Sequence, residues 1–179
     1  MSVTKDLKPV LRAMRKDKRY KRLKEAFDSM PLFQLPVEKL ADEIETIHKT
    51  RSIRIIDVSD PKFVDNLIKA NVHDQSARGR LTEIMMQAVR VTSKLEKALK
   101  TMRFHLLLTF NDALRGYRTK EERLQIVEMV LKTFTDYIDD MASLRESAQL
   151  CVKDIDQGNF SIDKTIRMLE MHIARERRI

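Results

Sequence analysis

Four histidines, one cysteine and two pairs of aspartates are the residues of this sequence whose types could support metal or acid–base chemistry. No two histidines stand at a metal-binding spacing such as H-x3-H or H-E-x-x-H. The aspartates at 139–140 and at 154 and 156 lie in ordinary helical sequence, whereas two-metal chemistry needs several carboxylates that converge on one point. A single cysteine, Cys151, excludes an internal disulfide and a cysteine-rich metal site. We therefore predict a protein that is not an enzyme and that uses no cofactor and no metal.

Positive charge is the feature that does indicate a function. The formal net charge is +8, from 35 Lys and Arg against 27 Asp and Glu. Residues 5–24 contain ten of these bases and two of these acids, which leaves 25 of each in a neutral remainder. A concentrated basic block indicates a polyanionic partner. The candidate nucleic-acid-binding residues are Lys8, Arg12, Arg15, Lys16, Lys18, Arg19, Tyr20, Lys21, Arg22 and Lys24.

The basic block has the pattern of an amphipathic helix. Apolar residues at 7, 10, 11 and 14 share one helical face, and those at 23, 27 and 30 continue an apolar face after a polar interruption. Tyr20 stands among the cations, and an aromatic ring among cations is typical of proteins that stack on unpaired bases. No helix-turn-helix or RNP pattern is present, so base-specific reading has no support. This favours single-stranded DNA over duplex DNA or RNA.

The elements that position this block are predicted to be helices. The prolines of 29–36 end the basic helix, and Pro36 starts a second helix that ends near Lys49. The β-branched piece 52–61 is compatible with extended structure, and Asp60–Pro61 is a good start for a short helix that ends about Asn71. We predict three consecutive parts: a basic helical segment 1–50, a connector with a short helix 51–73, and a long hairpin with a C-terminal helix 74–179.

Two long apolar seams predict the hairpin. A helix from about Asp74 to Arg115 has apolar residues spaced three and four apart, and His105 falls on the extension of this seam, so we expect it in the interior. Thr119 to Glu122 forms a capping box, after which a second seam runs to a stop at Gly158 and a last helix capped by Ser161. Helices joined by so few residues must fold back antiparallel. The fold class is all-α: a long antiparallel helical hairpin with coiled-coil-like seams, shorter flanking helices and self-association. The candidate oligomerisation residues are Leu81, Ile84, Val91, Leu95, Leu124, Val127, Leu131 and Phe134.

The sequence also predicts where the protein works. No stretch approaches the 18 or so consecutive apolar residues of a membrane span, and the first ten residues contain no apolar signal region. We expect no membrane partner and a cytoplasmic, intracellular location, which would be the host cytoplasm for a viral protein.

The C-terminal part of the chain, about 74–171, resembles the C-terminal region of the T4-type phage recombination mediators. The resemblance lies in Val130-Leu131-Lys132 with Thr135, in a helix that ends at Ile155, and in the segment 160–168. It implies a small, helical, oligomeric, non-enzymatic protein that binds single-stranded DNA and helps to load a recombinase onto strands covered by single-strand-binding protein. The basic segment 1–50 departs from the family pattern, so the family's DNA contacts are not carried over to residues of this chain.

The sequence therefore predicts a non-catalytic nucleic-acid-binding protein that acts as a recombination or replication accessory factor. Its expected partners are single-stranded DNA, further copies of itself, and a recombinase or single-strand-binding protein. Three alternatives stay open: a viral DNA-packaging small subunit that binds duplex DNA, a structural adaptor whose basic helix docks on an acidic protein, and a helical subunit of a ribonucleoprotein complex.

Overall fold

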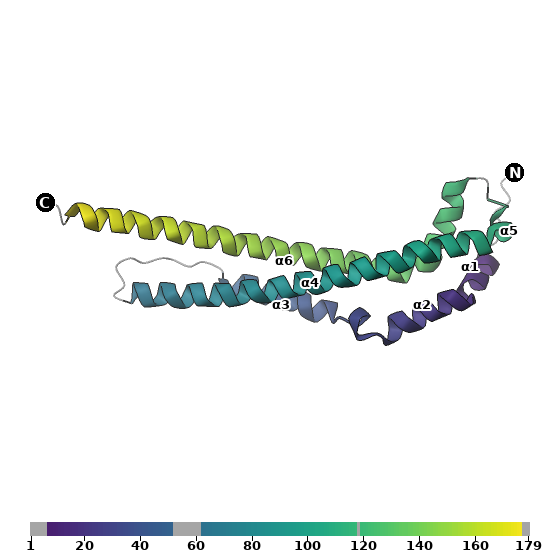
Figure 1. Ribbon diagram of the computed structural model, residues 1–179, viewed down its shortest axis with the longest axis horizontal. Coiled ribbons are helices and arrows are strands. Elements are labelled where there is room, and N and C mark those ends of the chain that lie inside the picture. Colours follow the sequence, from purple (N-terminus) through teal and green to yellow (C-terminus); the bar gives the residue numbers. More distant parts are fainter. Residues whose placement is uncertain (1–6, 52–61, 118, 177–179) are drawn as a thin grey trace. The chain divides into compact units, whose positions relative to one another are not determined.

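The computed structural model describes residues 7–51, 62–117 and 119–176, and within them the chain is helical without a strand (Figure 1). Helix α4 packs against α6 as the predicted hairpin, which confirms the all-α fold class with shorter flanking helices. The predicted extended piece and the Asp60–Pro61 cap lie outside the described residues. The elements are α1 (Lys8–Arg15), α2 (Lys18–Ser29), the 3-10 turn η1 (Pro31–Phe33), α3 (Val37–Arg51), α4 (Phe63–Thr109), α5 (Asn111–Leu114) and α6 (Lys120–Glu176).

The chain forms two compact units, and each unit combines segments that are distant in the sequence. Unit 1 comprises Met1–Val37 and Ala88–Ser143, and unit 2 comprises Glu38–Gln87 and Leu144–Ile179. Helices α4 and α6 contribute to both units. The predicted parts 1–50, 51–73 and 74–179 are consecutive segments of the sequence, and this division stays a prediction.

The predicted seams form the interior of the hairpin. In unit 1, Arg103 of α4 pairs with Glu128 of α6, and in unit 2 Arg78 of α4 pairs with Asp156 of α6. The partner's residue number rises along α6 as the arginine's number falls along α4, as antiparallel helices require. The seam of unit 1 buries Ala88, Val91, Leu95, Leu99, Met102 and Leu106 of α4 with Val127, Val130, Leu131, Phe134 and Met141 of α6. The seam of unit 2 buries Ala77, Leu81 and Ile84 of α4 with Leu144, Ala148, Cys151 and Ile155 of α6.

Three positions of the predicted three-and-four spacing are not fully buried: Ala98, Leu124 and Ile138. Ala98 is only half-buried and Leu99 is buried in its place, because a helix with 3.6 residues per turn drifts from a 3.5-residue repeat. Leu124 is 39% exposed, since it lies in the first turns of α6.

The basic segment forms two helices rather than the single one predicted. Helix α1 ends at Arg15, and Asp17 adopts the extended backbone (φ −58°, ψ 139°) of a residue that precedes a helix. Its Oδ1 accepts hydrogen bonds from the backbone N–H of Arg19 at 2.8 Å and of Tyr20 at 3.0 Å. An aspartate at this position satisfies amide groups that the first turn leaves free, so α2 starts again at Lys18.

The long helices run further than predicted. The short helix and the long helix expected on either side of residue 73 are one continuous helix, α4, which begins at Phe63. Helix α6 passes through Gly158 and Ser161 without the predicted stop and restart. A glycine inside a helix costs only about 0.5–1 kcal/mol relative to alanine, so packing of the rest of the helix outweighs it.

The turn of the hairpin is more complex than the predicted single stop after Arg115. Helix α4 ends at Thr109, Phe110 interrupts the helix, and the four-residue α5 follows. The start of α6 is as predicted: the backbone N–H of Glu122 donates to Thr119 Oγ1 at 3.0 Å, and the backbone N–H of Thr119 donates to the Glu122 carboxylate at 3.4 Å. This is the reciprocal pair of a capping box.

Among the helices in the described ranges, none is both long enough and apolar enough to cross a membrane.

Candidate nucleic-acid interface

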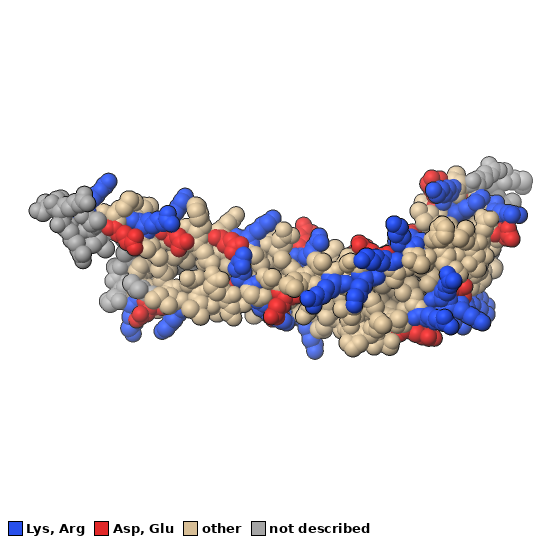
Figure 2. All heavy atoms as spheres, viewed as in Figure 1, with Lys and Arg blue, Asp and Glu red and all other residues tan. Residues whose placement is uncertain are grey.

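The cations of α1 and α2 form an exposed surface of unit 1, which we call the basic surface. All nine cationic candidates from Lys8 to Lys24 are exposed. Figure 2 shows basic side chains gathered over α1 and α2. Lys24 donates to the Asp28 carboxylate at 2.6 Å, which raises the pKa of the Lys24 ammonium, and Arg19 lies beside His105. Within the described residues, six of the cations take part in no ion pair and no side-chain hydrogen bond: Arg12, Arg15, Lys16, Lys18, Lys21 and Arg22.

One face of α1 borders an open hollow of about 660 Å³. Lys8, Arg12 and Lys16 line it together with the small side chains of Pro9 and Ala13. Residues four apart in a helix lie on one face, about 6 Å apart along the axis. The hollow is therefore a place where an anionic group can approach three positive side chains.

An aspartate and a histidine hold the start of α2 against α4. His105 Nε2 lies 3.1 Å from Asp17 Oδ1, and both side chains are largely buried, with 17% and 14% of their area exposed. The other ring nitrogen, Nδ1, lies 3.5 Å from Arg19 Nη1 and 3.3 Å from Thr109 Oγ1. The prediction of an interior histidine thus holds in part: the side chain is largely buried, but its two nitrogens have polar partners and it lies at the edge of the seam.

The Asp17 carboxyl is stabilised in its charged form. Burial alone would raise its pKa, but hydrogen bonds from the Tyr20 amide, the His105 side chain and the Arg19 amide outweigh burial and lower the pKa below its ordinary value of 3.8. A charged Asp17 is therefore part of the folded state at neutral pH.

Tyr20 is in the core, and its predicted role as a base-stacking residue is wrong for this structure. Its side chain is 7% exposed, its hydroxyl donates to the carbonyl of Val130 at 3.4 Å, and its ring meets that of Phe134 edge-on at 6.1 Å. Tyr20 continues the apolar spacing of Leu23 and Phe27, and this signal could have identified it as a core residue. It anchors α2 on α6 and so presents the surrounding cations outward.

The candidate oligomerisation residues are placed inside the chain. Seven of the eight are at most 1% exposed, because the two seams cover each other within the hairpin: Leu81, Ile84, Val91, Leu95, Val127, Leu131 and Phe134. Leu124 alone of this set is exposed. These seven residues could therefore contact another subunit only if the hairpin opened. Self-association stays a prediction, and it would have to use a different surface of the chain.

The acidic and sulfur-containing residues of unit 2 have structural partners. Asp154 accepts hydrogen bonds from Arg51, and Asp156 from Arg78. Cys151 is 5% exposed, and burial raises the pKa of its thiol. Among the residues that the structure describes, no group of three or more His, Cys, Asp and Glu side chains could hold a metal ion.

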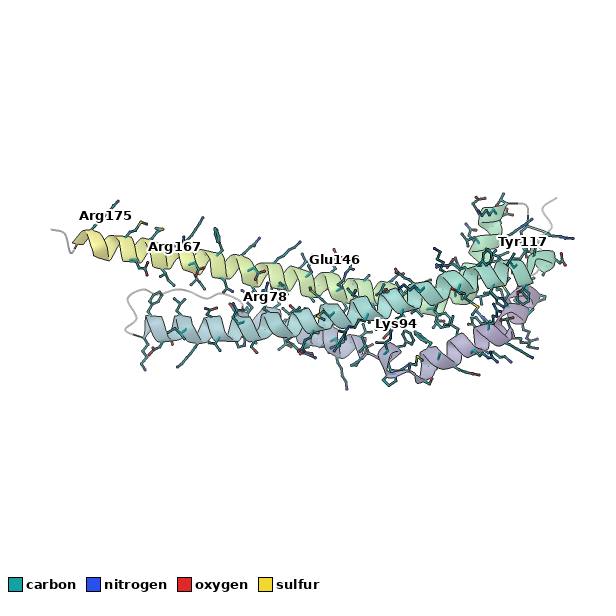
Figure 3. All side chains as sticks on the ribbon, viewed as in Figure 1. Arg78, Lys94, Tyr117, Glu146, Arg167 and Arg175 are labelled. Carbon is teal, nitrogen blue, oxygen red and sulfur yellow. The ribbon has the colours of Figure 1, made fainter. Side chains whose placement is uncertain are left out.

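Positive charge divides unequally between the two units. Unit 1 contains 20 Lys and Arg against 12 Asp and Glu, whereas unit 2 contains 15 of each. The whole net charge of +8 therefore belongs to unit 1. Besides the basic surface, unit 1 includes four exposed cations of α4 that were not among the predicted binding residues: Arg90, Lys94, Lys97 and Lys100. Figure 3 labels Lys94.

No protein-family model, no curated protein and no solved structure matches this chain. The resemblance of residues 74–171 to the phage mediators thus stays a prediction.

Proposed function

We propose that this protein is a non-catalytic nucleic-acid-binding protein that holds single-stranded DNA on the basic surface of unit 1. The observation that carries the proposal is the set of six exposed cations on α1 and α2 that take part in no ion pair with a described residue. Cations paired with carboxylates would gain little from a phosphate, whereas free ones release counterions from the nucleic acid when they bind it.

The way in which the helices are held supports this proposal. Tyr20 and Met14 are buried, and Asp17 is bound to His105, so apolar and acidic side chains of the segment face the interior of unit 1. The flexible cationic side chains remain outside on a fixed backbone. Binding through them orders few additional backbone groups, which limits the entropic cost of association.

The accessory role in recombination or replication is part of the proposal and rests on the resemblance to the phage mediators. In that role the protein would hold a strand while a recombinase assembles on it, and repeated copies of the basic surface would add avidity.

The test compares two variants in which six cations are changed to Gln. The interface variant carries the changes at Arg12, Arg15, Lys16, Lys18, Lys21 and Arg22. The control variant carries them at the exposed cations of unit 2 that have no ion pair within the described residues: Lys39, Lys69, Arg145, Lys153, Arg167 and Arg175. Both variants lose six positive charges, so any difference between them reports position rather than net charge.

Fluorescence anisotropy with a single-stranded oligonucleotide is measured over a salt series. If three of the six cations contact phosphates, the interface variant binds about 100-fold more weakly near 0.1 M salt, and its salt slope falls by about 2. The control variant keeps the slope of the unmodified protein. Circular dichroism checks that the helices of both variants are intact.

Three outcomes overturn the proposal. Equal losses in the two variants would mean that binding follows net charge alone. Tighter binding of duplex DNA than of single strands would favour the packaging function. A protein without nucleic-acid affinity at low salt would favour docking on an acidic protein.

A further inference from the structure

The outward face of α4 in unit 1 carries a second row of cations. Arg90, Lys94, Lys97 and Lys100 are all exposed, and within the described residues none of them forms an ion pair (Figure 3 labels Lys94). Their spacing of three and four residues places them along one side of the helix, opposite the buried seam. The neighbouring outward positions Ser93 and Thr101 are uncharged. One exposed carboxylate of α4, Glu96, borders the row beside Lys97, and it forms no ion pair within the described residues.

An exposed aromatic ring continues the row. Phe104 follows Lys97 by seven residues and Lys100 by four, and it is 67% exposed. By contrast, Phe27 of the same unit is packed: its ring centre lies within 6 Å of those of Phe33, Phe134 and Tyr137. Phe104 has no ring or cation contact within the described residues, and its next neighbour on the same face, Leu108, is 63% exposed.

This face of α4 adjoins the basic surface. The next residue, His105, contacts Asp17 and lies beside Arg19, so α2 runs along one edge of the face. On the other edge, Arg103 pairs with Glu128 of α6. The residues of the face between these edges are exposed, and its cations add to the positive charge that α1 and α2 bring to unit 1.

We propose that Phe104 stacks on an unpaired base of a bound single strand whose phosphates contact the cations of α4. A ring that is two-thirds exposed, one turn beyond Lys100 and two turns beyond Lys97, offers both interactions of a single-strand site, an aromatic face for bases and positive charge for phosphates. Phe104 thus takes the role that the sequence analysis assigned to Tyr20. The inference rests on the proposed function, because it concerns the same bound single strand and adds where on α4 that strand would lie.

The absence of tryptophan from the sequence makes the contact directly observable. Phe104→Trp introduces a unique indole at this position, and stacking of a base on it quenches its fluorescence. Titration with an oligothymidine strand should quench the emission, and a duplex of equal length should not, because its bases are already paired and stacked. The control is Phe160→Trp in the neutral unit 2, where the ring is 63% exposed and has the Lys164 ammonium 4.6 Å from its centre.

Affinity provides the second readout. Phe104→Leu keeps an apolar side chain but removes the ring, and it should weaken single-strand binding about 10-fold while leaving duplex binding unchanged. Leu108→Ala removes an equally exposed apolar side chain and should change neither affinity. Because Phe104 is exposed, the variants should unfold at the same temperature as the unmodified protein.

The outcomes separate this inference from the proposed function. If the unmodified protein does not bind oligonucleotides, the proposed function fails. If it binds, but Phe104→Trp is not quenched and Phe104→Leu binds normally, only the inference fails. A blue shift of the indole with rising protein concentration, without DNA, would overturn the inference in favour of a contact between two copies of the chain.

Discussion

A single aspartate determines where the basic surface begins a new helix. Asp17 accepts two backbone hydrogen bonds at the start of α2 and lies 3.1 Å from a ring nitrogen of His105 on α4. This one carboxylate caps the start of α2 just after α1 ends. Through its contact with His105, it also attaches the segment to the hairpin. Because the basic side chains on either side of it depend on this attachment, its loss should affect the stability of unit 1.

Replacement of Asp17 by alanine should destabilise the protein by about 1 kcal/mol at pH 7, since it removes a helix cap. Asp17→Asn keeps a capping oxygen and should lose less. Thermal unfolding followed by circular dichroism measures both changes. Asp28→Ala serves as the control, because Asp28 is exposed and pairs only with Lys24 in the adjacent turn. Equal stability of Asp17→Ala and the unmodified protein would contradict the assigned role.

The contribution of Asp17 should depend on pH in a defined direction. Its pKa is lower in the folded state than the ordinary value of 3.8, so the stability that it contributes is complete above that value. It is lost as the pH falls through the folded-state pKa. The difference in melting temperature between Asp17→Ala and the unmodified protein should therefore shrink below pH 3.8, and a difference that grows there would refute this linkage.

Helix α3 is held on the hairpin of unit 2 by two arginines. Arg80 of α4 binds Glu43 through two hydrogen bonds of 2.6 and 2.9 Å, which lower the pKa of the Glu43 carboxyl. At the end of α3, Arg51 donates to Asp74 of α4 at 3.1 Å and to the carbonyl of Asp154 of α6 at 3.3 Å. Asp74 is 1% exposed and Arg51 10%, so this contact is within the interior.

Arg51→Leu should destabilise the protein by about 3 kcal/mol, because it deprives the buried Asp74 carboxylate of a cation. Urea unfolding measures the change. The double variant Arg51→Leu with Asp74→Leu should be more stable than Arg51→Leu alone. Arg78→Leu breaks a half-exposed pair with Asp156 and should cost less than about 1 kcal/mol. A cost for Arg51→Leu as small as that for Arg78→Leu would exclude an important role of the buried pair.

The two helical glycines of unit 2 should respond differently to alanine. Nothing lies within 4 Å of the position that a Cβ of Gly79 would take, so Gly79→Ala should stabilise the protein by about 0.5–1 kcal/mol. A Cβ on Gly158 would lie 3.1 Å from Nη2 of Arg51, which Asp74 and Asp154 hold in place. Gly158→Ala should therefore gain less stability than Gly79→Ala in the same unfolding assay, and an equal gain would mean that Arg51 moves freely.

At the scale of the whole molecule, charge and structure are divided between the units. Unit 1 carries the net charge of +8 and all the cations of the proposed interface, whereas unit 2 is neutral and pairs Arg51, Arg78 and Arg80 with its own carboxylates. The hairpin seams of both units are filled within one chain. The six-cation and Phe104 experiments therefore address unit 1 alone, with unit 2 as an internal control in the same molecule.

The sequence by itself determined the helical class, most of the seam positions and the capping box at Thr119 to Glu122, because these depend on spacing and on hydrogen bonds between near neighbours. It also located the basic block. Only the tertiary structure decided which faces of the basic helices are covered, since the partners of Tyr20 and Asp17 are 110 and 88 residues away in the chain. For the same reason the exposed Phe104 could be recognised only after both neighbouring helices were in place.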